Sequence, residues 1–182
     1  KFIIDGQIAA GRLFKIIDNA ANLQRVKGDN PIETEDHPEY NTLKGEISFK
    51  DVKFSYPSRV DVPVLKGISF EVKQHQSVAL VGETGSGKST IIQLLERFYD
   101  PLAGQVTLGG VDIMRIEPVL LRKKIALVSQ EPVLFATSIY NNIHFGNKDA
   151  TREQIYEACK KANAYDFIKK LEKGFDSYSG QG

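Results

Sequence analysis

The residues best suited to chemistry lie in a glycine-rich stretch between a short apolar run and a helix. Gly82 opens the spacing Gly-x-x-x-x-Gly-Lys-Ser, which closes on Gly87, Lys88 and Ser89. Glycines let backbone N–H groups turn inward around an anion, because no Cβ blocks the conformation or the close approach. The following helix adds the positive end of its dipole, Lys88 can reach the β- and γ-phosphates, and the Ser89 hydroxyl can bind Mg²⁺. The stretch therefore predicts a site for a nucleoside triphosphate with Mg²⁺.

The alternative is a glycine-rich turn that only joins a strand to a helix. The flanks favour the phosphate loop, because residues 77–81 are apolar and β-branched and residues 90–98 carry apolar side chains at helical spacing. The loop residues predicted to bind the nucleotide are Gly82, Gly85, Ser86, Gly87, Lys88, Ser89 and Thr90.

Strands on either side of this loop are expected to position it. Residues 47–54 alternate apolar and polar, which predicts a half-buried strand. Residues 64–72 form a second strand region with a bend at Gly67, and the two suggest an antiparallel pair. Residues 105–113 predict another hairpin, around two consecutive glycines.

A continuous apolar run at residues 125–129 is typical of a buried parallel strand. We expect it beside residues 78–81 in a central sheet, after a helical turn or two at residues 119–124. The predicted fold class is therefore α/β, with strands and helices in one core.

The remaining segments are helical or irregular. Residues 6–18 predict a short amphipathic helix, and residues 20–45 are polar and rich in helix breakers, which predicts a linker. Residues 130–146 are expected to be an irregular connection. A capping box at residues 151–154 predicts a helix, and a second helix should cover residues 164–171.

Composition excludes several classes of function. With 24 Lys and Arg against 23 Asp and Glu and no long basic run, the chain does not resemble a nucleic-acid binder. The single Cys159 allows no intrachain disulfide, and the three histidines show no metal-ligand spacing. No apolar run is long enough to span a membrane, and no secretory signal opens the chain. Because it begins at Lys1 and stops on Gly182, we expect it to be part of a longer protein.

Several stretches in order resemble the nucleotide-binding domain of ATP-binding cassette (ABC) transporters, in the multidrug-resistance, P-glycoprotein-like branch. This resemblance implies a P-loop NTPase core with a mixed sheet, an antiparallel β subdomain and the beginning of an α-helical subdomain. The stretches are FSYPSR at 54–59, VALVGETGSGKSTIIQLLERFYDP at 78–101, GGVDI at 109–113, VSQEPVLFATSIYNNI at 128–143 and ANAYDFIKKL at 162–171.

The resemblance also implies roles for individual residues. Tyr56 matches the aromatic residue that stacks on adenine, and a Tyr before a proline in a turn favours an exposed rim over the alternative, a core position. Gln130 matches the residue that contacts Mg²⁺ or the attacking water, and it follows an apolar strand, where ligands collect in α/β sheets; the alternative is a loop glutamine. Lys88 and Gln130 are thus the implied catalytic residues, and Ser89 and Gln130 the implied Mg²⁺ ligands.

The implied function is ATP binding and hydrolysis coupled to export of substrates, at the cytoplasmic face of a membrane. The implied partners are the transmembrane domain of the same transporter and a second nucleotide-binding domain in a head-to-tail ATP sandwich. Residues 1–19 would be a helical tail from the membrane domain and 20–45 a linker. Residues 46–130 would form the ATP-binding core and β subdomain, and residues 131–182 the coupling loop and the start of the helical subdomain.

Parts of the family pattern are missing from these 182 residues. The LSGGQ signature, the acidic motif with the Mg²⁺-binding Asp and the catalytic Glu, and the switch histidine are absent. Gln181 stands where relatives often carry an acidic residue. We therefore expect these residues alone to hydrolyse ATP negligibly. A nucleotide-regulated binding or assembly module without turnover is the alternative, and a soluble ABC ATPase of the DNA-repair type is a third reading.

Overall fold

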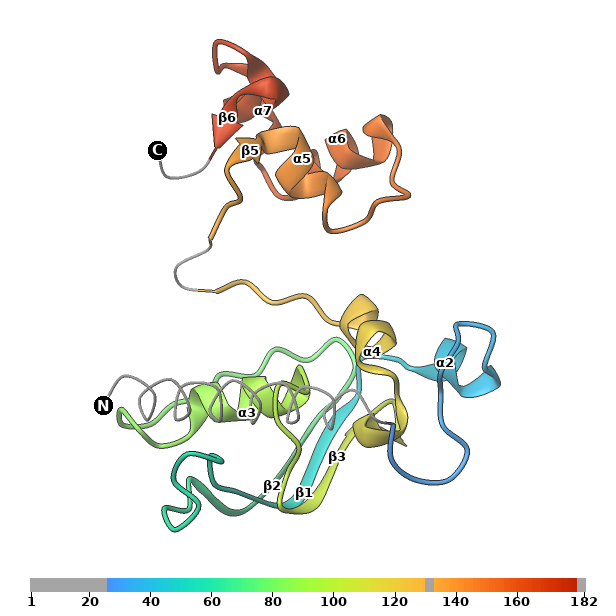
Figure 1. Cartoon of the computed structure of the whole chain (residues 1–182), viewed down its shortest axis with the longest axis vertical. Coiled ribbons are helices and arrows are strands. Elements are labelled where there is room, and N and C mark those ends of the chain that lie inside the picture. Colours follow the sequence, from blue (N-terminus) through green and yellow to red (C-terminus); the bar gives the residue numbers. More distant parts are fainter. Residues whose placement is uncertain (1–25, 130–132, 180–182) are drawn as a thin grey trace, which may run out of the picture. The chain divides into compact units, whose positions relative to one another are not determined.

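The computed structural model describes residues 26–129 and 133–179 of the chain. The chain divides into two compact units, one that runs to Ala126 and one that starts at Leu127 (Figure 1). We call the first the sheet unit and the second the helical unit, and describe each by itself. The helix predicted at residues 6–18 lies outside the described residues.

The sheet unit is built on an antiparallel sheet of four strands in the order β2-β1-β3-β4 (Figure 1). The strands are β1 (Ile47–Phe54), β2 (Leu65–Val72), β3 (Ala103–Leu108) and β4 (Val111–Asp112). Alternation along β1 buries one side chain and exposes the next, except at a register shift between Phe49 and Val52. The predicted antiparallel pair and the predicted hairpin are both confirmed.

Two helices close the core of the sheet unit. Helix α3 (Lys88–Leu95) inserts Leu94 into it, and helix α4 (Pro118–Lys124) inserts Leu121, both completely buried. A 3-10 turn, η1 (Ile113–Arg115), connects β4 to α4. Burying a leucine of this kind contributes about 1.5 to 3 kcal/mol, so the start of α3 is held by a packed core. The helical turn expected before residue 125 is confirmed as α4.

The described part of the expected linker has structure of its own. Within residues 26–45, helix α2 (Pro38–Thr42) forms, and Ile32, Tyr40 and Leu43 are buried in the core. Ile32 also pairs in parallel with Ile116. The prediction of a linker did not include this packing: three apolar side chains spaced among polar ones are enough to dock these residues on the core.

The two predicted parallel strands do not form among the described residues. Residues 78–81 and 125–129 have no strand pairing, and Val81 and Val128 are each 92% exposed. A parallel strand is stabilised by ladder partners and by cover on both faces. The described residues supply no ladder partner to either segment, so apolar sequence alone does not make them strands.

The helical unit holds three helices and a two-stranded sheet within residues 133–179. The helices are α5 (Ile139–His144), α6 (Arg152–Lys161) and α7 (Tyr165–Lys169), the strands are β5 (Thr137–Ser138) and β6 (Tyr178–Ser179), and a 3-10 turn, η2 (Gly174–Asp176), precedes β6. Its core is a small cluster of buried side chains: Ile155, Cys159, Ile168 and Phe175.

Two predictions for this unit have different outcomes. The capping box is confirmed: Thr151 N donates to Gln154 Oε1 at 2.8 Å, and Gln154 N donates to Thr151 Oγ1 at 3.3 Å. The prediction that residues 130–146 form an irregular connection is wrong for α5. The Ser138 side chain caps this helix by accepting from the Asn141 N–H at 3.1 Å. Across the described ranges, every helix is too short or too polar to cross a bilayer.

Candidate functional site

The phosphate loop runs directly into helix α3, which begins at Lys88. Gly87 is the N-cap residue, with φ of 93°, a conformation that favours glycine. A Cβ at Gly87 would lie 2.7 Å from Leu65 Cδ2, so only glycine fits between the loop and β2. Because Gly87 has no side chain to cap the helix, the first-turn N–H groups are left for a ligand.

The ammonium group of Lys88 folds back over this loop. Its Nζ donates to the backbone oxygens of Gly82 at 2.8 Å and Glu83 at 2.7 Å, and lies 3.3 Å from Ser86 Oγ. The loop therefore holds a positive charge at the same place as the helix N-terminus. Both features attract an anion.

Exposure separates the hydroxyl residues of the first turn. Ser89 is exposed, whereas Thr90 is buried, with an exposed fraction of 3%. The Ser89 side chain is thus accessible to a ligand, and the Thr90 hydroxyl is directed into the protein, where it meets Tyr56. Ser86 and Gly85, earlier in the loop, are also exposed.

Tyr56 is fastened to α3 through its hydroxyl. It donates to Gln93 Oε1 at 2.8 Å and lies 2.8 Å from Thr90 Oγ1. Its half-buried ring meets the rings of Phe54 and Tyr99 edge-on, with centroids 5.0 and 5.3 Å away. The ring is therefore fixed relative to the helix that carries the phosphate loop.

The site residues predicted from the sequence have different outcomes. The seven loop residues lie together in one turn and the start of one helix, and Tyr56 joins them through Thr90. Gln130 lies outside the described residues. Gln93 was missed, although the three-residue spacing from Thr90 puts both on one helix face, where they can share a partner.

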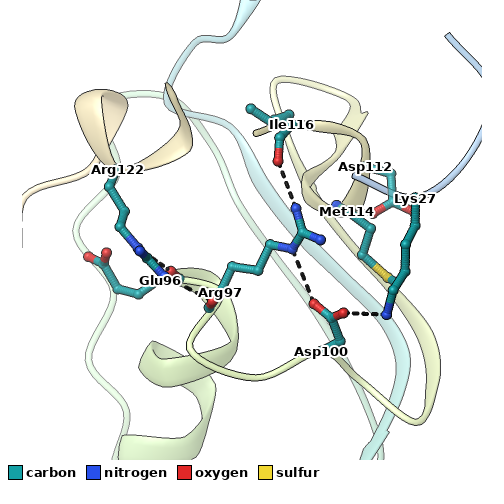
Figure 2. Close-up of polar contacts among 8 residues, drawn as sticks. All are labelled: Lys27, Glu96, Arg97, Asp100, Asp112, Met114, Ile116 and Arg122. Atoms are coloured by element: carbon teal, nitrogen blue, oxygen red, sulfur yellow. Dashed lines mark hydrogen bonds and ion pairs between the residues drawn. The ribbon is translucent and has the colours of Figure 1, made fainter. Parts of the chain in front are cut away.

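The C-terminal end of α3 carries buried charge (Figure 2). Arg97 is 1% exposed, and its Nε donates to Asp100 Oδ1 at 3.1 Å. Glu96 is 5% exposed, and burial raises the pKa of its carboxyl, an effect that Arg122 partly offsets. Neither buried group was singled out from the sequence, because a charged residue just after a helix is ordinarily solvated.

The donors at the loop fit a phosphate chain with Mg²⁺. Uncapped N–H groups and an ammonium match phosphate oxygens, and an exposed serine hydroxyl matches a hard cation. A Cβ at Gly82 would lie 2.8 Å from Ser86 Oγ, so a larger residue there would displace the Ser86 hydroxyl. The roles of these residues in binding phosphate and Mg²⁺ stay a prediction.

Comparison with known proteins gives a consistent result. The family described as "ABC transporter" matches residues 65–181. ABC transporter B family member 3 of Dictyostelium discoideum is 49% identical over 97% of this chain and 12% of its own length. Multidrug resistance protein 1 of Entamoeba histolytica is 45% identical over 94% of this chain and 13% of its own length. The chain thus spans about an eighth of these curated relatives.

A solved structure of a bacterial Atm1-family ABC exporter with ATP bound is similar in fold. It is 35% identical, with a TM-score of 0.75, and the match covers 98% of this chain and 30% of the exporter chain. This likeness confirms the predicted α/β fold class of a P-loop NTPase. With the family match and the B-family relatives, it shows that the chain belongs to the ABC transporter family, as part of a nucleotide-binding domain of the P-glycoprotein-like branch.

Proposed function

We propose that this chain is the ATP-binding part of an exporter, in which ATP binding and hydrolysis drive substrates across a membrane. The observation that carries the proposal is the position of Lys88. Its ammonium lies over the phosphate loop, 2.8 Å from Gly82 O, at the uncapped start of α3. A phosphate chain supplies the negative charge that this arrangement favours.

Each residue of the site has a proposed task. Lys88 binds phosphate oxygens, the exposed Ser89 hydroxyl binds Mg²⁺, and Tyr56 stacks on adenine. Gln130 is proposed as the second Mg²⁺ ligand and as the residue that orients the attacking water. When bound, Mg²⁺ neutralises charge on the phosphates.

Tyr56 is positioned for this task by contacts on three sides. Phe54 and Tyr99 pack against its ring edge-on, and its hydroxyl bonds to α3. A pre-oriented ring loses little freedom when a base stacks on it, so less of the stacking free energy is offset. Adenine is therefore the proposed base.

The proposed partners are those of the family. Hydrolysis is assigned to the full-length protein, because the signature, the acidic motif and the switch histidine are absent from these 182 residues. A second nucleotide-binding domain would supply the signature across a head-to-tail sandwich. The transmembrane domain would contact residues 130–142, and the chain would then lie at the cytoplasmic face of a membrane.

The test is ATP binding and turnover by the full-length protein with Lys88→Ala. We expect ATP affinity to fall about 10- to 100-fold, since a charge-assisted contact to phosphate is lost. Lys148→Ala removes an exposed lysine in the helical unit and is the matched control. Equal ATP binding by wild type and Lys88→Ala would overturn the proposal. ATP binding without turnover in the wild type would instead indicate a nucleotide-regulated module.

A further inference from the structure

Helix α3 ends in a conformation that its sequence does not favour. Phe98 N donates to Gln93 O at 2.9 Å, and Arg97 N donates to Leu94 O at 3.0 Å. These two bonds define a Schellman motif, whose left-handed position is ordinarily glycine or asparagine. Here Arg97 occupies it, with φ of 53°. An arginine in this conformation carries backbone strain of about 1 kcal/mol or more.

The Arg97 side chain joins α3 to a neighbouring loop (Figure 2). Its Nη1 donates to Ile116 O at 2.7 Å, and its Nε donates to Asp100 Oδ1 at 3.1 Å. The guanidinium is 0% exposed. A buried charge with these partners resists displacement, because any shift would leave charged and polar groups without their bonds.

The same network includes residues 26–35, which precede β1 along the chain and which we call the entering segment. Lys27 Nζ lies 2.6 Å from Asp100 Oδ2, and Lys27 N donates to Met114 O at 2.8 Å. Farther along, Ile32 N donates to Arg115 O at 2.7 Å. Figure 2 shows Arg97 and Lys27 each bonded to a different oxygen of the Asp100 carboxylate. Asp100 therefore connects the entering segment with the end of α3.

A second arginine holds the same helix end. Arg122 Nε donates to Glu96 O, and its Nη2 donates to Arg97 O, both at 3.1 Å. Carbonyls at a helix C-terminus lack intrahelical partners, so these bonds satisfy them and attach α3 to α4. The C-terminal end of the helix is thus fixed from two sides.

We propose that Arg97 is a positioning residue for the phosphate loop, and that the contact between Lys27 and Asp100 couples the entering segment to nucleotide affinity. Helix α3 is eight residues long. A helix of that length is a stiff rod of about 12 Å, so an anchored C-terminus sets where Lys88 and the first-turn N–H groups point. Binding groups must be held to within about 0.5 Å of their productive geometry. The inference rests on the proposed function.

The contact between Lys27 and Asp100 is the most solvent-exposed contact that we describe in this network. The Lys27 side chain is 47% exposed, against 12% for Asp100. Removing it leaves the bonds of Arg97 in place, so Lys27→Met tests coupling without dismantling the core. Arg97→Gly removes the guanidinium and its contacts. Glycine also relieves the backbone strain at this position, so the conformation of the helix end is kept while the side-chain bonds are lost.

The experiment uses the full-length protein and a fluorescent ATP analogue with Mg²⁺. We expect Lys27→Met and Asp100→Asn each to raise the Kd of the analogue about fivefold. Asp100→Asn also removes the negative charge beside Arg97, so its Kd should be at least as high as that of Lys27→Met. The double variant should bind like Asp100→Asn, because the Lys27 contact is already lost there. Lys27→Arg should restore the wild-type Kd.

Glu35→Gln is the control variant. It removes the ion pair of 2.5 Å between Glu35 and Lys123, which joins the same entering segment to α4 instead of α3. Its Kd should match the wild type. A lower melting temperature in Lys27→Met and Asp100→Asn with an unchanged Kd would overturn the inference and leave a structural role only.

Two further arms separate this inference from the proposed function. If the wild type binds the analogue and Lys88→Ala does not, unchanged affinity in Lys27→Met and Asp100→Asn overturns the coupling alone. If Lys88→Ala binds like the wild type, the proposed function fails, and the coupling fails with it. Raised KM for ATP with unchanged kcat in Lys27→Met would further support positioning of the binding loop.

Discussion

The hydroxyl oxygen of Tyr56 lies 2.8 Å from Oγ1 of Thr90, the third residue of helix α3. The turn after β1 and the start of α3 are therefore joined by a side-chain hydrogen bond. In the proposed function, this bond links the ring that stacks on the base with the helix that binds the phosphates. The base and the phosphates of one nucleotide would then be bound by two parts of the sheet unit that move together.

Two substitutions at Tyr56 distinguish the contribution of its ring from that of its hydroxyl. Tyr56→Phe removes the hydrogen bonds and keeps the stacking surface, so ATP affinity should change by less than about threefold. Tyr56→Ala should lose about 1 to 3 kcal/mol of stacking, or about 5- to 150-fold in Kd. The measurement is the Kd of the full-length protein for ATP.

Inorganic triphosphate is the control ligand for this prediction. It has no base, so its Kd should be the same for Tyr56→Ala and Tyr56→Phe. If Tyr56→Ala weakened ATP and triphosphate equally, the ring would support the loop, and adenine stacking would be rejected.

Two glycines of the loop should respond differently to alanine. Gly87→Ala adds a Cβ 2.7 Å from Leu65 Cδ2 at a φ of 93°, so the loop or β2 must shift, and we expect a loss of about 2 to 3 kcal/mol. At Gly85, φ is 85°, and an added Cβ would meet no atom within 4 Å. Gly85→Ala should therefore cost only about 1 kcal/mol of backbone strain. Denaturant unfolding of both variants measures the difference, and equal losses would contradict the steric argument.

Glu96 should make the sheet unit less stable as pH rises. Burial raises its pKa above the ordinary 4.5, so the folded protein holds the proton more tightly than the unfolded chain. This contribution to stability is complete below about pH 4.5 and is lost as pH rises through the folded pKa. Glu96→Gln removes the ionisation, so its stability relative to wild type should increase from acidic to neutral pH.

Thermal unfolding across this pH range tests the prediction for Glu96. Glu46→Gln is the matched control, because Glu46 is an exposed carboxylate of the same unit. If the difference in stability between wild type and Glu96→Gln stayed constant with pH, burial would not raise the pKa of the Glu96 carboxyl.

The capping box of α6 predicts a local effect in the helical unit. Thr151→Ala removes the hydroxyl that accepts from the Gln154 N–H, and the expected cost is about 1 kcal/mol. Thr151→Ser keeps an acceptor and should retain most of that stability. Hydrogen exchange of the first-turn amides of α6 reports the change, and similar exchange in both variants would argue against the cap.

Local patterns in the sequence predicted what local physics determines. Strand β1 follows from alternation, and the start of α6 follows from the side chains at Thr151 and Gln154. The phosphate loop follows from the spacing of its glycines, because backbone conformation there depends on residues within the loop. These features need no information from distant segments.

Features that depend on distant partners were not predictable in the same way. Residues 78–81 are apolar, but a strand needs a pairing partner, which residue type alone does not supply. Ile32 gave no periodic signal, yet it is completely buried against Ile116. Arg97 was missed because its buried position depends on Asp100 and on the loop at Ile116, whose approach the sequence does not show.

The helical unit contains its own chemical reporter. Cys159 is the single cysteine of the 182 residues; it is 4% exposed in the core of the unit, and burial raises the pKa of its thiol. Alkylation needs an accessible thiolate, so this side chain reacts only when the unit opens. The rate at which an alkylating reagent modifies Cys159 therefore measures how often α6 separates from its neighbours in the native sequence.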